Sequence, residues 1–463
     1  MILAPPTAAG PRHGSDVADR TGLIRRFTRS AAVTDSPVTP NRAILSWLEE
    51  NRRIFRHEVT RIPFADLVGW RFDAAGGDLG HESGRFFTVE GLRIHTDAHD
   101  WMQPIINQPE IGILGFVAKE FDGVLHFLMQ AKMEPGNINS VQLSPTVQAT
   151  RSNYTGVHRG RPITFLEHFV PPTAGTVLLD SLQSEQGAWF LRKRNRNIVV
   201  EITEEPPELP DFRWLTLGQI HRLLGFDDVV NMDARTVLSS IPLGPRVEDQ
   251  GAYRSLTGVL SWLTRVRATS ELSQRYRPLR AVEGWQLTGD RIRHEEGRYF
   301  QVIAAAVTAA NREVASWTQP LFEPIGLGVT AFLVRPIGGV LHLLAHARVE
   351  AGLANVAEIA PTVQCCPDNY AGLPSERQPR FLTEASTTTG SQVRYDTVLS
   401  EEGGRFFEAR SRYRIVEVPE DFPLDVPPDF AWISVHQAST LLRYDGYLNV
   451  QARTLIAALL ATL

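Results

Sequence analysis

The chain has 463 residues, of which 43% are hydrophobic and 21% charged, a composition typical of globular proteins. Its formal net charge of −5 lacks the basic excess of nucleic-acid-binding proteins, and its only two cysteines, Cys365 and Cys366, are adjacent, which excludes a disulfide framework within the chain. Since no run of about 18 apolar residues predicts a membrane span, we expect a cytoplasmic protein without nucleic-acid or membrane partners.

Residues 1–40 are rich in proline, glycine, serine and alanine and show no apolar periodicity. This composition is typical of segments that do not fold by themselves, so it predicts a flexible N-terminal tail. The run Arg25-Arg26-Phe27 resembles a twin-arginine export signal. No apolar signal core follows it, which argues against export.

The rest of the chain consists of two similar halves. Residues 41–241 align with residues 251–463 almost without gaps, and from Trp101 onward the offset is constant at 216 until late in each half. Solenoid repeats have periods of up to about 50 residues, so a repeat of this length predicts a duplicated domain. A stretch rich in proline, glycine and charge separates the halves near residues 242–251. We predict two α+β repeats, each of ordinary domain size.

Both halves show the same order of predicted elements. An amphipathic helix opens each half, at 42–53 and 256–267. Short strands follow, and in the first half they are predicted at 85–89, 113–121, 124–133 and 197–202. After a proline-rich linker at 205–210 or 422–428, helical periodicity predicts helices at 214–224 and 432–442, and last helices at 234–241 and 452–463.

The strand predicted at 124–133 has one polar face. Side chains alternate between the two faces of a strand, which places on one face His126, Gln130, Lys132 and Glu134. The second copy places there His342, His346, Arg348 and Glu350. A strand with one face in water would alternate in the same way. The histidine and glutamate present in both copies favour a face that lines a ligand pocket.

The segment at 145–161 combines polar, aromatic and cationic side chains, namely Thr146, Gln148, Arg151, Asn153, Tyr154, His158, Arg159 and Arg161. Arginine binds phosphate through paired charge-assisted hydrogen bonds, and an aromatic ring can stack on a base, so this set suits a nucleoside diphosphate. A solvated basic loop is the alternative. The second copy keeps Gln364, Asn369 and Tyr370 but replaces Arg151, His158 and Arg159 by Pro367, Pro374 and Ser375. The two halves should therefore bind unequally.

A metal site is the main competing interpretation of the polar face. His342, His346 and Glu350 are possible ligands, but the first copy has Gln130 at the position of His346. The sequence contains no His-Glu-x-x-His motif, no Gly-x-Gly-x-x-Gly fingerprint, no Walker loop and no Gly-x-Ser-x-Gly nucleophile elbow. We predict neither a metal nor a cofactor.

The runs at 123–137 and 141–150, followed by Asn153-Tyr154, resemble the NDP-hexose 2,3-dehydratases of deoxysugar biosynthesis. The resemblance covers both halves, from about Arg42 to the C-terminus. It implies a tandem duplication of a Nudix-like mixed-sheet domain with flanking helices, a homodimer, and dTDP-sugar pockets in both halves. It also implies a role in antibiotic and other natural-product biosynthesis. The chain has no recognisable Nudix box, which argues against pyrophosphate hydrolysis.

The activity implied by the resemblance is elimination of water across C2–C3 of dTDP-4-keto-6-deoxy-glucose, which gives a 3,4-diketo-2,6-dideoxy sugar. The reaction needs a base for the C3 proton, a partner for the enolate and an acid for the C2 hydroxyl. We expect these in the first half, with Glu134 or His126 as base, Lys132 as the enolate partner, and Tyr154 or His158 as acid. The expected substrate-binding residues are Gln130, Thr146, Gln148, Arg151, Asn153 and Arg159. A second set comprises His342, His346, Arg348, Glu350, Gln364, Asn369 and Tyr370.

Two other classes of function fit the same residues. A nucleotide-sugar isomerase or epimerase would also begin by removing a proton next to a carbonyl, but its product would keep the mass of the water. A sugar-nucleotide binding protein without catalysis would be stabilised by its ligand and would exchange no substrate proton with solvent.

Overall fold

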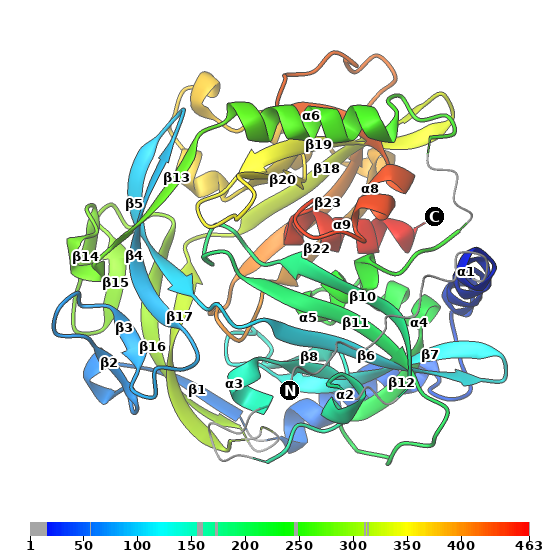
Figure 1. The fold of residues 1–463 in the computed structure, drawn as a ribbon, viewed down its shortest axis with the longest axis horizontal. Coiled ribbons are helices and arrows are strands. Elements are labelled where there is room, and N and C mark those ends of the chain that lie inside the picture. The colour runs from blue at the N-terminus through cyan, green and yellow to red at the C-terminus, as the bar shows by residue number, and fades with distance from the viewer. Residues whose placement is uncertain are drawn as a thin grey trace, which may run out of the picture.

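The computed structural model describes residues 16–55, 57–154, 161–171, 175–244, 249–309, 312 and 314–462. It is an α+β protein whose described strands form two seven-stranded and two five-stranded sheets (Figure 1). This confirms the α+β class and the presence of two similar halves. Among the described residues, no helix is long and apolar enough to cross a membrane.

Each half is built on a mixed seven-stranded sheet, in which one central pair of strands is parallel and the other pairs are antiparallel. The strands of the first half are β10 (Thr176–Ser184), β11 (Arg194–Glu201), β6 (Gly112–Phe121), β7 (Val124–Met133) and β12 (Phe212–Thr216), with β8 (Val141–Ser144) beside β7 and β9 (Val147–Ala149) beside β6. Their counterparts in the second half are β22 (Val393–Ser400), β23 (Arg410–Glu417), β18 (Gly328–Ile337), β19 (Val340–Val349), β24 (Phe430–Ser434), β20 (Ala357–Ala360) and β21 (Val363–Cys365).

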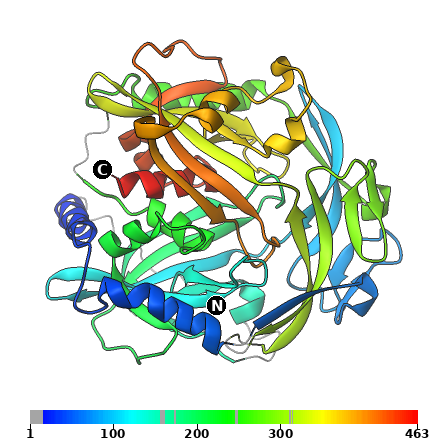
Figure 2. The same cartoon turned by 180° about the vertical axis from the view of Figure 1, so that it is seen from behind.

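Helices cover these sheets on the outside and fill the space between them. The longer helices are α1 (Asp16–Ala32), α2 (Asn41–Ile54), α4 (Leu217–Leu223), α5 (Met232–Ser239), α6 (Leu256–Thr269), α8 (Val435–Leu441) and α9 (Val450–Leu460), and two short ones are α3 (Arg151–Tyr154) and α7 (Leu382–Thr387). Figure 2 shows α1 and α2 on the outer side of the first half. Helices α5 and α9 pack against each other in the middle of the molecule, where Asn231 and Asn449 cap their N-termini.

The five-stranded sheets exchange strands between the halves. Strand β1 (His57–Ile62) of the first half pairs with β16 (Phe300–Ala309) of the second, and β13 (Leu272–Arg277) of the second half pairs with β4 (Thr88–Thr96) of the first. The remaining strands are β2 (Trp70–Phe72), β3 (Leu79–His81) and β5 (Asp100–Asn107) in one sheet and β14 (Trp285–Leu287), β15 (Arg291–His294) and β17 (Ser316–Pro324) in the other. The two halves are thus interlocked by their backbones.

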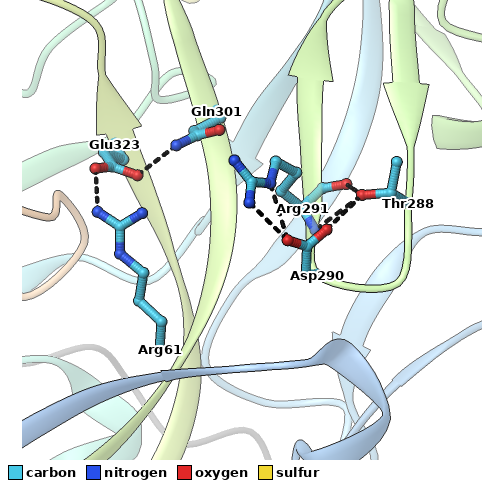
Figure 3. A network of polar contacts seen from close by, with 6 residues as sticks. All are labelled: Arg61, Thr288, Asp290, Arg291, Gln301 and Glu323. Carbon is cyan, nitrogen blue, oxygen red and sulfur yellow. Dashed lines mark hydrogen bonds and ion pairs between the residues drawn. The ribbon is translucent and has the colours of Figure 1, made fainter.

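A polar network ties the exchanged strand β1 to its host sheet (Figure 3). Arg61 of β1 forms an ion pair with Glu323 of β17. The side chain of Gln301, on β16, donates to the other oxygen of Glu323 at 2.6 Å. These contacts join one residue of the first half to two strands of the second.

Two glycine turns bring the halves into backbone contact. Strands β7 and β19 run into the turns Glu134-Pro135-Gly136 and Glu350-Ala351-Gly352. The N–H of Gly136 donates to the carbonyl of Gly403 at 2.7 Å, and the N–H of Gly352 donates to the carbonyl of Gly187 at 2.6 Å. A Cβ atom on Gly136 would lie 1.6 Å from the carbonyl oxygen of Phe406. The repeated Glu-x-Gly pattern therefore marks the points where each half touches the other.

The predicted N-terminal tail differs from the structure over residues 16–40. Residues 16–32 form α1, and Phe27 is fully buried in the core of the first half. Leu23, Phe27 and Ala31 recur every four residues and all pack on this core, an apolar stripe that the overall composition of the segment conceals. Residues 1–15 lie outside the described part of the chain.

Two other local predictions need correction. The segment at 214–224 is not one helix, because β12 continues to Thr216 and α4 begins after it, where Thr216 and Gln219 form a capping box. The corresponding segment at 432–442 is likewise β24 followed by α8. The strand predicted at 85–89 begins only at Thr88, since Phe86 has a φ of 74° and cannot continue a strand. The helices predicted at 42–53 and 256–267 are confirmed.

We predict that Gly136→Ala destabilises the protein. Its new Cβ would overlap the Phe406 carbonyl and force the two halves apart locally, so the free energy of unfolding should fall by about 3 kcal/mol. Gly289→Ala is the matched control, because a Cβ there meets nothing within 4 Å. Denaturant unfolding of both variants measures the difference, and equal stability of the two would contradict this account of the turn.

A second prediction concerns Glu358, a buried carboxyl that accepts a hydrogen bond of 2.6 Å from Ser184 of the other half. Burial raises the pKa of Glu358 from 4.5 to about 7. A folded-state pKa above the unfolded value makes stability fall as pH rises between these two values. Gln142 occupies the equivalent position in the first half and donates to Ser400 at 2.8 Å, so an amide fits there. Glu358→Gln should raise the free energy of unfolding by about 3 kcal/mol above pH 7.

The same substitution should leave stability nearly unchanged at pH 4.5, where the carboxyl of Glu358 is protonated in the folded protein. Thermal unfolding of both proteins from pH 4.5 to 8.5 gives this profile. A Glu358→Gln variant that is less stable than the native chain at every pH would show that the carboxylate itself stabilises the interface.

Candidate active site

A cavity lies where the ends of β7 and β9 and the start of α5 meet residues of the second half. The polar residues of the first half that line it include Lys132, Glu134, Gln148, Asn153, Arg161, Lys193 and Asp233. The second half contributes Arg312, Trp317, Gln319, Glu402 and Arg405. An aromatic wall consists of Trp70, His81, Phe86, Phe87 and Phe190. We call this space the first cavity. It is built by both halves of the chain.

Glu134 is held in the first cavity by amide side chains. Gln148 donates to its carboxylate at 2.6 Å, Asn137 at 3.1 Å and Asn231 at 3.2 Å. Asn231 also caps α5 and donates to Gln148 at 3.0 Å, so the strand, the loop and the helix are joined at this residue. Glu134 is only 3% exposed. Three donors on one carboxylate fix its orientation as a hydrogen-bond acceptor.

Three carboxyl groups gather in the first cavity. One oxygen each of Glu134, Asp233 and Glu402 lies within 4.8 Å of the others. Burial raises the pKa of Asp233 well above its usual value, and the neighbouring carboxylates of Glu185, Glu402 and Glu134 add to the effect. Like charges at this spacing repel one another, which favours a protonated carboxyl in the cluster over three carboxylates.

Cationic side chains surround the carboxyl cluster. Lys132, 5% exposed, donates from Nζ to the carbonyl of Gln148 at 3.2 Å. Burial lowers the pKa of Lys193 to about 8. The guanidinium of Arg405 lies 4.4 Å from the ring centre of Phe87 in a cation–π contact. The cavity therefore offers both proton acceptors and positive charge for an anionic ligand.

A second cavity occupies the equivalent place in the second half. Among its polar lining residues are Arg348, Glu350, Gln364, Asn369 and Tyr370, and from the first half Trp101, Gln103 and Gln186. Glu350 accepts hydrogen bonds from Gln364 at 2.8 Å and from Arg348 at 3.1 Å. The framework of the first cavity is thus repeated, with arginine in place of Lys132.

The reactive groups differ between the two cavities. With the offset of 216, Glu402 corresponds to Gln186 and Lys193 to Ala409, and with the later offset of 218, Asp233 corresponds to Gln451. The second cavity therefore has amides at two of the three carboxyl positions and no equivalent of Lys193. The second cavity keeps charged side chains, Arg348 and Glu350 among them, but lacks the three-carboxyl cluster.

The structure brings together part of the residue set that the sequence predicts. Lys132, Glu134, Gln148 and Asn153 line the first cavity. Arg348, Glu350, Gln364, Asn369 and Tyr370 line the second. His158 and Arg159 lie outside the described residues.

The N-terminal part of the polar face of β7, with His126 and Gln130, does not line the first cavity. His126 is 2% exposed and bonds to Ser36 at 2.7 Å and to the carbonyl of Val124 at 2.9 Å, and burial lowers its pKa. Gln130 donates to Asp211 at 3.0 Å instead. Between them Leu128 packs into an apolar layer around Phe212. That layer covers the middle of the face, so only its C-terminal end lines the cavity.

Three other residues of the predicted first site lie away from the cavity lining. Thr146 accepts from the N–H of Val117 at 2.9 Å and donates to the carbonyl of Leu128, so it links strands of the sheet. Arg151 is exposed at the start of α3, and Tyr154 packs against an apolar cluster.

In the second half the two predicted histidines also lie outside the cavity lining. His342 accepts from the N–H of Tyr253 at 2.9 Å and donates to the carbonyl of Val340 at 2.8 Å. His346 stacks on Phe430 with ring centres 4.3 Å apart and pairs with Asp429 at 3.3 Å. Burial lowers the pKa of both histidines.

The sequence interpretation missed Asp233, Lys193 and the residues that the second half supplies, Glu402 and Arg405 among them. A signal for some of them was present, because these positions change their charge between copies that are otherwise similar. No sequence motif surrounds Asp233. Its replacement by Gln451 in the other copy is the one feature that distinguishes it. Each half contributes residues to the cavity of the other because strands are exchanged between the halves. Local sequence patterns do not predict such an exchange.

Comparison with known proteins agrees with the repeat. The sequence model of the family described as NDP-hexose 2,3-dehydratase matches residues 41–241 and 256–459. A dTDP-4-dehydro-6-deoxy-alpha-D-glucopyranose 2,3-dehydratase of Amycolatopsis orientalis is 49% identical over 464 residues, covering 98% of this chain and 96% of the relative. A protein of the same name from Saccharopolyspora spinosa is 51% identical and covers 94% of both chains. Another from Streptomyces violaceoruber is 47% identical and covers 91% of this chain and 97% of the relative. The chain therefore belongs to the NDP-hexose 2,3-dehydratase family.

Proposed function

We propose that this chain eliminates water across C2–C3 of dTDP-4-keto-6-deoxy-glucose and forms the dTDP-linked 3,4-diketo-2,6-dideoxy sugar. Three relatives that are about half identical over nearly their whole length are named for the 2,3-dehydration of this sugar nucleotide. The observation that carries the proposal is the first cavity, where the buried carboxylate of Glu134 lies on the same strand end as Lys132. A base and a cation are what removal of the C3 proton next to a ketone requires.

In this proposal Glu134 removes the C3 proton. Its two oxygens are oriented by Gln148, Asn137 and Asn231, so the carboxylate is preorganised toward one direction of attack. Lys132 supplies positive charge for the enolate oxygen that develops at C4. The buried position of His126 and its bonds to Ser36 and Val124 favour Glu134 over His126 as the base.

The rest of the first cavity suits the nucleotide. Arg161 and Arg312 line it, and we assign them to the diphosphate, since arginine matches phosphate oxygens with paired donors. The ring of Trp317 is only partly buried, and we assign it as the face on which a thymine base can stack. In this assignment Arg161 and Arg312 take the place of Arg151, which is exposed and does not line the cavity, whereas the proposed role of Arg159 is untested.

Two further parts of the proposal concern the scaffold. Each seven-stranded mixed sheet with its helices is assigned to a Nudix-like domain, and the absence of a Nudix box from the sequence argues against pyrophosphate cleavage. We also propose a homodimer, in keeping with the family resemblance. Light scattering of the purified chain measures its mass, and a single-chain mass would exclude the dimer.

The decisive experiment compares Glu134→Gln with Glu350→Gln. These substitutions remove equivalent carboxylates from the first and second cavities and keep side-chain size. We expect Glu134→Gln to lower kcat for dehydration by about 10²–10⁴, the usual contribution of a general base, and Glu350→Gln to keep most of the activity. The product is followed by mass spectrometry, in which only dehydration removes the mass of water.

An active Glu134→Gln variant beside an inactive Glu350→Gln variant would move the chemistry to the second cavity. A product with unchanged mass from the native chain would instead favour an isomerase or epimerase. Stabilisation by dTDP-sugar with no exchange of the C3 proton would indicate a binding protein.

A further inference from the structure

Glu402 enters the first cavity from the half of the chain opposite to Glu134. It follows β22 in a turn whose backbone is bound to the Glu134-Pro135-Gly136 turn, since Gly136 donates to Gly403 and the N–H of Glu408 donates to Gly136, both at 2.7 Å. Gln319 of β17 donates to Gly404 at 2.7 Å and secures the other side of the turn. Glu402 is therefore held in a fixed relation to Glu134.

One oxygen of Glu402 is available to a ligand. Oε1 accepts from the N–H of Gly404 at 3.0 Å. Oε2 is buried and has no hydrogen-bond partner among the residues that the structure describes. A buried polar atom without a partner is costly, so this oxygen is open to a hydrogen bond with a bound ligand.

The second cavity has lost this group. Gln186 stands at the equivalent position and donates to Glu401 at 3.2 Å and to the sulfur of Met232. An amide cannot give up a proton to a leaving group. The carboxyl of Glu402 thus belongs to the cavity that also holds Lys132 and has no counterpart in the other. This difference associates Glu402 with the reaction and not with the scaffold that both cavities share.

We infer that Glu402 is the catalytic acid that protonates the departing C2 hydroxyl, so that the second half completes the active site of the first. This inference rests on the proposed dehydration. Glu134 breaks the C3–H bond, and the electron pair forms an enolate between C3 and C4. The pair then forms the C2–C3 double bond as the C2–O bond breaks, and the proton of Glu402 converts the leaving hydroxyl to water.

The remaining steps return both groups to their starting states. The enol carries its proton on the C3 oxygen, and the Glu402 carboxylate accepts that proton as the C3 ketone forms. The C2 carbon takes up the proton held by Glu134. The sum is loss of one water molecule, without oxidant, reductant or further reactant.

The surroundings of Glu402 keep it protonated near neutral pH. Burial raises the pKa of Glu402 to about 8, Arg405 opposes this, and the carboxylates of Glu134 and Glu185 raise the pKa further. The titratable and charged groups that face it are Glu134, Glu185, Lys193, Asp233 and Arg405. Asp233 is the other acid of the cluster, and it lies on α5 of the first half, whereas Glu402 enters from the second half.

The test separates proton removal from water loss. Native chain and the Glu402→Gln variant are incubated with dTDP-4-keto-6-deoxy-glucose in deuterated buffer, and C3 deuteration and loss of water are followed by NMR and mass spectrometry. We expect Glu402→Gln to slow dehydration by about 10²-fold or more while C3 exchange stays within a few-fold of native. Retained exchange also reports a folded variant. Glu384→Gln, an exposed carboxyl on α7, is the control and should behave as native.

In the native chain kcat should also fall as pH rises through about 8, because the acid must be protonated. Dehydration at the native rate in Glu402→Gln overturns the inference. Loss of both exchange and dehydration overturns it too, since Glu402 would then act before the C3 proton leaves. Selective loss of dehydration in Asp233→Asn, with Glu402→Gln unaffected, transfers the role to Asp233. A native chain that neither exchanges nor dehydrates would refute the proposed function itself.

Discussion

The structure depends on the backbone contact between the two halves at their glycine turns. Gly136 and Gly352 each donate a hydrogen bond to the opposite half, at 2.7 and 2.6 Å. Each turn follows a glutamate that lines a cavity, Glu134 or Glu350. The contact that joins the halves therefore also sets the position of the residues in both cavities. Exchange of β1 and β13 between the five-stranded sheets joins the halves as well.

Duplication produced two cavities with one framework and different chemistry. The hydrogen bonds from Gln148 to Glu134 and from Gln364 to Glu350 are equivalent, at 2.6 and 2.8 Å. Around this shared pair, the first cavity has acidic groups at positions where the second has amides. A carboxyl cluster is costly to bury without a compensating function, because its members repel one another and lose hydration. This difference supports the assignment of catalysis to the first cavity.

Much of this architecture could be predicted from the sequence, and the reasons for the failures are physical. Alternation along residues 124–133 predicted the strand and the position of Lys132 and Glu134, because strand geometry is local. The same alternation could not show that Leu128 and its neighbours cover the face near His126, since that layer comes from distant segments. Glu402 reaches the first cavity only through the pairing of the halves. No local pattern encodes such a contact, and the one signal in the sequence, which the interpretation missed, is the change from Glu402 to Gln186 between the copies.

The central claim is that one active site is completed by both halves of the chain. A crystal structure with bound dTDP-glucose, which lacks the C4 ketone and cannot react, tests this claim most directly. We expect the hexose in the first cavity, with C3 facing the carboxylate of Glu134 and the C2 hydroxyl within hydrogen-bond distance of Glu402. A hexose that contacts only residues of one half, or that occupies only the second cavity, would contradict it.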